Sequence, residues 1–150
     1  MTRGNGALSV LIVEDEALLA MDIASIIEDA GHHVVGEVAS LREFCELRLA
    51  TPPDLAFVDI QLAEGSNGID VSASMRALWP ETMIVFITAN PGKVPADCPG
   101  PHGIISKPFS RQGLTAALHF IGEGIRQPPP ILPTPGNFRA SPQLVTDWQL

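Results

Sequence analysis

The sequence predicts an α/β fold, a doubly wound parallel sheet of five strands with helices on both faces. Five short apolar runs alternate with segments whose apolar residues repeat at helical spacing. The chain has 150 residues, of which 45% are hydrophobic and 17% are charged, which is typical of one globular domain. Several of the apolar runs also end in polar or charged side chains, as expected when ligands bind at the carboxyl ends of parallel strands.

The first predicted strand covers residues 8–13 and stops at the acids Glu14, Asp15 and Glu16. An apolar run of this length is typical of a strand that is buried on both faces. A helical stripe follows over 17–30, and Gly31 is suited to end that helix.

The second predicted strand covers residues 34–39, and a helix is expected from Ser40 toward residue 50. Ser40 and Glu43 have the spacing of a capping box, in which each side chain binds a backbone N–H group at the start of the helix. Two prolines at 52–53 prevent the helix from continuing.

The third strand is expected over 55–59, and a helix over about 69–78 that Pro80 stops. The fourth strand, 83–88, ends at Thr88, and the fifth, 103–106, is followed by Lys107. Four prolines between residues 89 and 102 forbid a full-length helix there, so the fourth helix is expected to be short or missing. Ser110 can cap a last helix that runs to about residue 126.

Residues 127–150 form a tail that differs in composition from the domain expected over 1–126. The tail holds six of the 14 prolines of the chain, with Arg139 and Asp147 as its charged residues. It could be a polyproline-type ligand, a disordered end, or a strand-like extension that packs back through Leu144, Val145 and Trp148. We expect it to be mostly disordered.

Composition also limits the class of function. The net charge of −8 and the pI near 4.8 argue against binding of nucleic acid or of an anionic membrane surface. The two cysteines are too few for a disulfide framework in a chain of this length. The opening residues do not resemble a signal peptide, and no apolar run reaches the roughly 18 residues of a membrane span, so we expect a cytoplasmic protein without membrane insertion.

The residues that end the strands favour the strand order 2-1-3-4-5. This order brings the ends of strands one, three, four and five together and leaves the second strand, whose end carries no ionisable side chain, at the edge. Because neighbouring strands lie about 4.8 Å apart, Asp15 and Asp59 can then share a cation, while Thr88 and Lys107 approach from the other side. Together with Glu14, three acids, a hydroxyl group and an ammonium group would meet in one pocket.

This set of groups favours magnesium-dependent phosphoryl chemistry. Carboxylates that lie close together repel, and Mg²⁺ with oxygen ligands relieves that repulsion while it also binds phosphate oxygens. Asp59 could attack phosphorus and form an acyl phosphate. Lys107 would neutralise the transferred group, and the Thr88 hydroxyl and nearby backbone N–H groups would hydrogen-bond its oxygens.

The chain resembles the response regulator receiver domain of two-component signalling over about residues 7–126. The resemblance rests on five motifs in order: residues 11–16 (LIVEDE), 57–60 (FVDI), 67–70 (NGID), 86–89 (FITA) and 106–109 (SKPF). It implies a flavodoxin-like (CheY-like) fold, Mg²⁺ bound by Glu14, Asp15, Asp59 and the backbone carbonyl of Gln61, and Asp59 as the phosphoacceptor. It also implies that Thr88 is the switch hydroxyl, that Thr88, Ala89 and Lys107 bind phosphate, and that Lys107-Pro108 is a cis peptide.

Two features depart from the usual receiver pattern. The position three residues before the lysine, usually aromatic, is Ile104, which puts the usual aromatic switch in doubt. The proline-rich crossover falls where receivers have their fourth helix. Both departures look like an atypical subgroup that often works with HWE-type histidine kinases. We also expect Gln61 and Asn90, each two residues after a site residue, to line the entrance of the pocket and to tune the phosphoryl lifetime.

The sequence therefore predicts a stand-alone response regulator rather than an enzyme in the usual sense, since it would catalyse only its own phosphorylation and dephosphorylation. Its partners would be a histidine kinase or phosphotransfer protein and a downstream protein target. One alternative is a receiver-like binding module that works without phosphorylation. A phosphohydrolase is the other alternative, but that reaction would need an acidic residue at position 61 to protonate the leaving group, and this residue is Gln61.

Overall fold

The computed structural model describes residues 6–95, 98 and 100–150 and has the predicted doubly wound architecture. The sheet order is β2-β1-β3-β4-β5-β6, in which the first five strands are parallel and β6 is antiparallel to β5. In chain order the elements are β1 (Ser9–Val13), α1 (Ala17–Asp29), β2 (His33–Val38), α2 (Leu41–Glu46), β3 (Leu55–Asp59), η1 (Ala63–Gly65), α3 (Gly68–Leu78), β4 (Met83–Thr88), η2 (Pro91–Lys93), β5 (Gly103–Ser106), α4 (Arg111–Arg126), β6 (Phe138–Ala140) and α5 (Pro142–Trp148). The predicted strand order 2-1-3-4-5 is confirmed, and β6 extends it at one edge.

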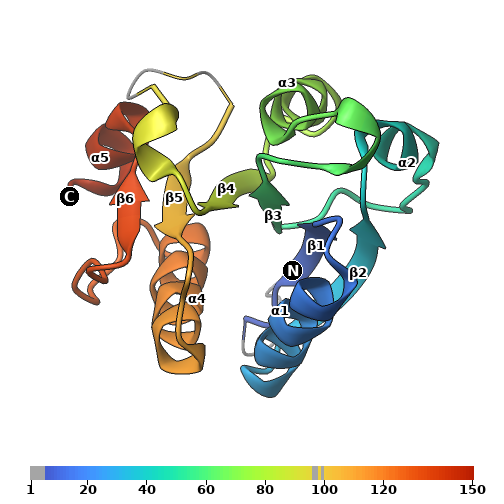
Figure 1. Cartoon of the computed structure of the whole chain (residues 1–150). Helices are drawn as coiled ribbons and strands as arrows, with labels where there is room; N and C mark the ends of the chain where they lie inside the picture. Colours follow the sequence, from blue (N-terminus) through green and yellow to red (C-terminus); the bar gives the residue numbers. More distant parts are fainter. Residues whose placement is uncertain (1–5, 96–97, 99) are drawn as a thin grey trace.

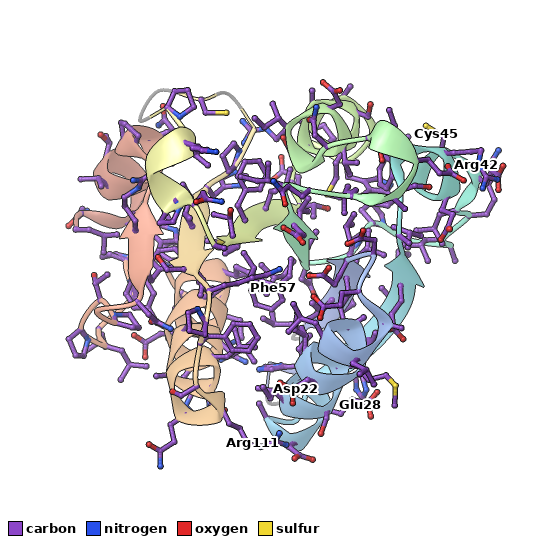
Figure 2. The ribbon with its side chains drawn as sticks, viewed as in Figure 1. Asp22, Glu28, Arg42, Cys45, Phe57 and Arg111 are labelled. Carbon is purple, nitrogen blue, oxygen red and sulfur yellow. The ribbon has the colours of Figure 1, made fainter. Side chains whose placement is uncertain are left out.

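Helices cover both faces of the sheet, α1 and α4 on one side and α2 and α3 on the other (Figure 1). The alternation of side chains along each strand produces two separate cores. In β1, for example, Val10 and Ile12 pack beneath α1 and α4, whereas Leu11 and Val13 pack against the α2 and α3 side. This two-sided burial explains why the strands are apolar at nearly every position. Figure 2 shows Arg111 at the start of α4, where it pairs with Asp29 of α1.

Helix α2 begins as predicted but is shorter than expected. The Ser40 side chain accepts a hydrogen bond from the N–H of Glu43, and the Glu43 carboxylate accepts one from the N–H of Ala39, so the capping box is confirmed. The helix ends at Glu46, after which Leu47 is extended. Leu47 and Leu49 both pack against the second core, and a spacing of two residues places both side chains on one side only in extended chain.

The crossover between β4 and β5 holds one turn of 3₁₀ helix, η2, in its described residues. The prediction of a short or missing fourth helix is therefore confirmed. Pro91 opens the turn, and the backbone N–H groups of Lys93 and Val94 close it on Asn90 and Pro91.

The expectation that the tail is mostly disordered is wrong. Strand β6 pairs with the edge of β5, and helix α5 then packs its apolar side against α4. The side chains of Phe138, Leu144 and Trp148 are 6%, 3% and 7% exposed. The ring of Trp148 meets Phe120 edge-on at 5.6 Å and occupies the space that a Cβ at Gly124 would fill. The tail folds because these three apolar side chains find a core and β5 offers an unpaired edge. In the part of the chain that is described, no helix is both long and apolar enough to cross a membrane.

Candidate functional site

Three acidic side chains meet where β1 and β3 end. Glu14 and Asp15 follow β1 directly, and Asp59 is the last residue of β3. One oxygen from each carboxylate lies within 4.8 Å of the others. Glu14 and Asp59 are only 6% and 9% exposed, whereas Asp15 is exposed. The predicted acidic cluster is thus assembled by two neighbouring strands of the sheet.

Lys107 reaches this cluster from the end of β5. Its Nζ donates hydrogen bonds to Asp59 Oδ2 at 3.1 Å and to Glu14 Oε1 at 3.2 Å. Strand β4 separates β5 from β3, so the long lysine stem is needed to span the gap. The Lys107-Pro108 peptide is cis, as the resemblance implied.

Burial, hydrogen bonds and neighbouring charges shift the pKa values of Glu14 and Lys107. Burial raises the pKa of Glu14 to about 7; the N–H group of Glu16 opposes the shift, the charge of Asp59 adds to it, and Lys107 opposes it. Burial alone would lower the pKa of Lys107, but the hydrogen bond and charge of Asp59, followed by those of Glu14, raise it. Lys107 therefore carries a positive charge, and this single charge does not fully neutralise the acids beside it.

The donor set fits a hard divalent cation. Three carboxylates offer oxygen ligands only, the type that Mg²⁺ prefers, and a single ammonium group leaves two of the three acidic charges uncompensated. The backbone N–H of Gln61 donates to Asp59 Oδ1 at 3.3 Å, which places the Gln61 backbone beside the cluster. The role predicted for its carbonyl as a metal ligand stays a prediction.

A cavity of about 100 Å³ opens beside the Asp59 carboxylate. The predicted phosphate-binding residues Thr88, Ala89 and Lys107 line it, and so do Gln61 and Asn90. Thr88 is buried, and its Oγ1 accepts a hydrogen bond from the N–H of Asn90 at 3.1 Å, so the hydroxyl proton is available to another acceptor. The complete lining is Asp59, Ile60, Gln61, Ile69, Thr88, Ala89, Asn90, Lys93 and Lys107.

The loop after Asp59 is held by its own contacts. The N–H of Gly68 donates to Ile60 O at 2.7 Å, and a Cβ at residue 68 would lie 2.2 Å from the carbonyl oxygen of Asp59. Only glycine allows this approach, so the start of α3 can pack directly on the backbone of the acceptor residue. The Asn67 side chain caps α3 through the N–H of Asp70.

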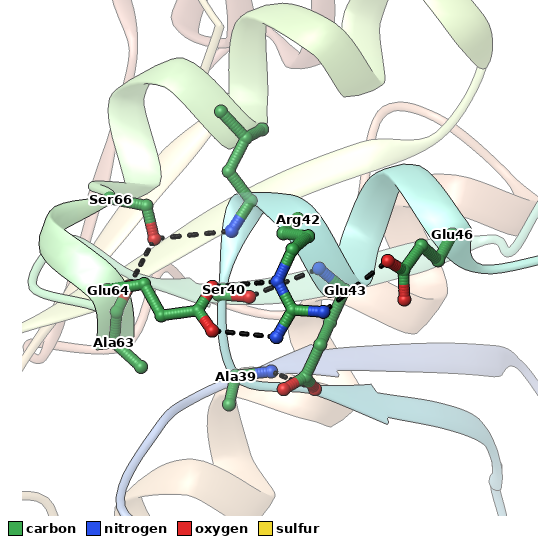
Figure 3. A network of polar contacts seen from close by, with 9 residues as sticks. Ala39, Ser40, Arg42, Glu43, Glu46, Ala63, Glu64 and Ser66 are labelled. Carbon is green, nitrogen blue, oxygen red and sulfur yellow. Dashed lines mark hydrogen bonds and ion pairs between the residues drawn. The ribbon is translucent and has the colours of Figure 1, made fainter.

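A polar network anchors the same loop to α2 (Figure 3). Arg42 donates from Nη2 to Glu64 Oε1 at 2.6 Å and from Nε to Glu64 Oε2 at 3.1 Å. Glu64 has the left-handed backbone conformation, with φ of 61°, which is uncommon for a residue with a side chain. Ser66 Oγ donates to Ala63 O and accepts from the N–H of Leu41. The loop is thus tied to the end of β2 and the start of α2 rather than left free over the cavity.

One predicted tuning residue lies elsewhere. Ile104 is buried in the second core and pairs with Phe86 on β4 and Arg139 on β6. It lines a different cavity, of about 220 Å³, between the crossover and the tail. The structure therefore does not bring Ile104 together with Asp59, Thr88 and Lys107.

Lys93 and Gly68 are among the residues of the site that the sequence did not reveal. Lys93 lines the Asp59 cavity from η2, and Gly68 contacts the Asp59 backbone. A signal for Lys93 was available, because the chain has only two lysines and the other is Lys107. Gly68 stands in the motif at residues 67–70, but the sequence does not reveal that the start of α3 contacts the end of β3.

The fold and this arrangement of acids, hydroxyl and lysine define a response regulator receiver domain of two-component signalling. Residues 10–119 match the family described as the response regulator receiver domain, and the chain belongs to that family.

Three relatives show the similarity in detail. PhyR, the phyllosphere-induced regulator of Methylorubrum extorquens, is 35% identical over 114 residues, which are 75% of this chain and 42% of that protein. The solution structure of the receiver domain of Erythrobacter litoralis PhyR has a TM-score of 0.69 at 31% identity, covering 78% of this chain and 91% of that one. The crystal structure of PhyR from Bartonella quintana, described there as an anti-anti-sigma factor, has a TM-score of 0.66 at 35% identity, covering 77% and 47%. The chain spans about half the length of the curated relatives that it matches first.

Proposed function

We propose that this receiver domain is phosphorylated on Asp59 in a Mg²⁺-dependent reaction and signals by binding a protein target. The donor is a histidine kinase, of the HWE type in our proposal, or a phosphotransfer protein. The observation that carries the proposal is the position of the Lys107 ammonium group, which touches Asp59 and Glu14 and lines a cavity that Thr88 also lines.

The residues divide the chemistry between them. A carboxylate oxygen of Asp59 attacks phosphorus, the new O–P bond forms, and the bond from phosphorus to the donor atom breaks with its electron pair leaving on the donor. Mg²⁺, held by Glu14, Asp15 and Asp59, would neutralise charge on the transferred group. Lys107 contributes its fixed positive charge to the same oxygens.

Thr88 and Ala89 line the cavity beside Asp59. Oγ1 of Thr88 accepts a hydrogen bond from the N–H of Asn90, which uses one of its lone pairs and leaves its proton free. The hydroxyl group can therefore donate that proton to a phosphoryl oxygen. A phosphoryl group on Asp59 would thus draw the end of β4 and the crossover toward it. The switch in this reading uses the loop after β4, since Ile104 offers no aromatic ring and lies outside the cavity.

The experiment is incubation with acetyl phosphate and Mg²⁺, followed by intact mass measurement. We expect a gain of one phosphoryl group, which disappears in EDTA and in Asp59→Asn. Asp22→Asn is the matched control, because Asp22 is an exposed acid on α1 (Figure 2) and the substitution makes the same chemical change. If wild type stays unmodified, or if Asp59→Asn is modified like wild type, the proposal is wrong and a phosphorylation-independent binding module takes its place.

The downstream partner is proposed only by its class, as a protein. Bartonella quintana PhyR is described as an anti-anti-sigma factor, but the similarity covers less than half of that chain. The similarity supports a shared phosphorylation step more directly than a shared target. We therefore propose a protein target, without nucleic acid, on the basis of the acidic net charge of −8.

A further inference from the structure

We propose that Lys93 is a second phosphoryl-binding residue, supplied to the Asp59 site by the 3₁₀ turn η2. The inference rests on the proposed phosphorylation of Asp59 and adds a residue that the receiver motifs quoted above do not include. The Lys93 ammonium group would bind a phosphoryl oxygen from the crossover after β4, whereas Lys107 reaches the cavity from the end of β5.

The position of the lysines is the first observation. The chain contains two lysines among its nine basic residues, and both line the one small cavity beside Asp59. Lys107 reaches the cavity from the end of β5, and Lys93 reaches it from the crossover after β4. The seven arginines of the chain are absent from the lining of this cavity in the described structure.

The charge of the site is the second observation. Lys107 already forms ion pairs with two carboxylates before any phosphoryl group is bound, so its positive charge is already partly compensated. Lys93, by contrast, makes no ion pair with any residue that the structure describes, and its side chain is exposed. With a divalent cation bound, the three acids and Lys107 balance, and the phosphoryl group then brings about two negative charges in exchange for one carboxylate charge. One positive charge is missing, and Lys93 is the cation on the wall of the cavity that can supply it.

The turn that carries Lys93 is short and is not crowded at Gly92. The turn η2 has three residues, and its middle residue, Gly92, has open space around the position of a Cβ. A lysine ammonium group on a flexible stem suits an anion whose position varies between donor, intermediate and product states. Because Lys93 lies five residues after Thr88 on the same loop, one phosphoryl group can hold both.

Amine labelling tests the contact directly, since the chain has only two lysines. Beryllofluoride with Mg²⁺ serves as the phosphoryl mimic, and acetylation of each lysine is followed by peptide mass mapping. We expect the labelling rate of Lys93 to fall by about threefold or more with beryllofluoride, the effect of a charge-assisted contact. The protection should be absent in Asp59→Asn. An unchanged Lys93 rate in wild-type protein that binds beryllofluoride would overturn the inference.

Two variants give a second readout. Lys93→Gln should lower the rate of phosphorylation by acetyl phosphate by about threefold to tenfold, while Lys93→Arg keeps the positive charge and most of the rate. Arg48→Gln is the matched control, because it removes one exposed positive charge just after the end of α2, outside the cavity lining. Equal rates in Lys93→Gln and wild type, with Asp59 still modified, would refute the role of Lys93 and leave the proposed function intact. Loss of all modification in wild type would instead refute the proposed function.

Discussion

His102 offers a test of how the crossover is attached to the sheet. Its Nδ1 accepts a hydrogen bond from the N–H of Ile84 at 2.9 Å, and its backbone N–H donates to Ile84 O at 2.7 Å. Its Nε2 lies 2.9 Å from Nη1 of Arg76, and its carbonyl accepts from the N–H of Ser141 in the tail. One histidine therefore contacts β4, α3 and the segment before α5.

The pKa of His102 sets how much the free energy of unfolding changes with pH. Burial, and then the charge of Arg76, lower the pKa of His102 from 6.5 to about 4. Between these two pH values the unfolded chain binds a proton that the folded chain excludes, so the free energy of unfolding falls as the pH falls. The stabilisation linked to neutral His102 is complete above pH 6.5 and is lost toward pH 4. Its size is at most about 3 kcal/mol, at 1.36 kcal/mol for each pKa unit.

The assay is urea unfolding of wild type and His102→Asn, followed by circular dichroism from pH 7.5 to 4. Asparagine keeps an acceptor near the Nδ1 position and does not titrate, so the other acid-sensitive groups cancel in the difference between the two proteins. We expect the stability advantage of wild type to shrink by up to about 3 kcal/mol as the pH falls. A difference that is independent of pH, or that grows in acid, would refute the reasoning.

Three further predictions concern the loop, the tail and the metal. Gly68→Ala should lower the free energy of unfolding by about 1 to 3 kcal/mol and slow the phosphorylation of Asp59, whereas Gly136→Ala, at a site with open space, should do neither. In denaturant unfolding, Trp148→Ala should cost about 3 to 5 kcal/mol, against less than about 0.5 kcal/mol for Ile131→Ala at a position that is 91% exposed. Mg²⁺ at about 100 times its Kd should stabilise wild type by about 2.7 kcal/mol, and Asp15→Asn should respond much less; an equal response in both proteins would contradict the assignment of Asp15 as a ligand.

Much of the fold was predictable because its signals are local. The strands were visible as apolar runs, since both faces of the sheet are covered and each strand is buried at nearly every position. The helix starts were visible at Ser40 and Ser110, whose side chains bind backbone N–H groups three residues ahead. The prolines of the crossover predicted the loss of a helix because proline removes the N–H group that a helix needs.

The end of α2 and the fate of the tail were not predictable in this way. Leu47 leaves the helix because two leucines at a spacing of two can both reach the core from extended chain. The tail folds because the ring of Trp148 packs into the space beside Gly124, a position 24 residues away on another helix. Proline content favoured disorder, but burial of three large apolar side chains outweighed that tendency.

The sequence by itself determined the identity of the groups that end the strands, and parallel topology then required Glu14, Asp15, Asp59, Thr88 and Lys107 to lie at one edge. Only the tertiary structure decided that Lys107 touches both Asp59 and Glu14, that Ile104 faces a different cavity, and that Lys93 joins the site. The physical reason is that a strand end is a local property of the chain, whereas the lining of a cavity depends on how the crossover and its neighbours pack together.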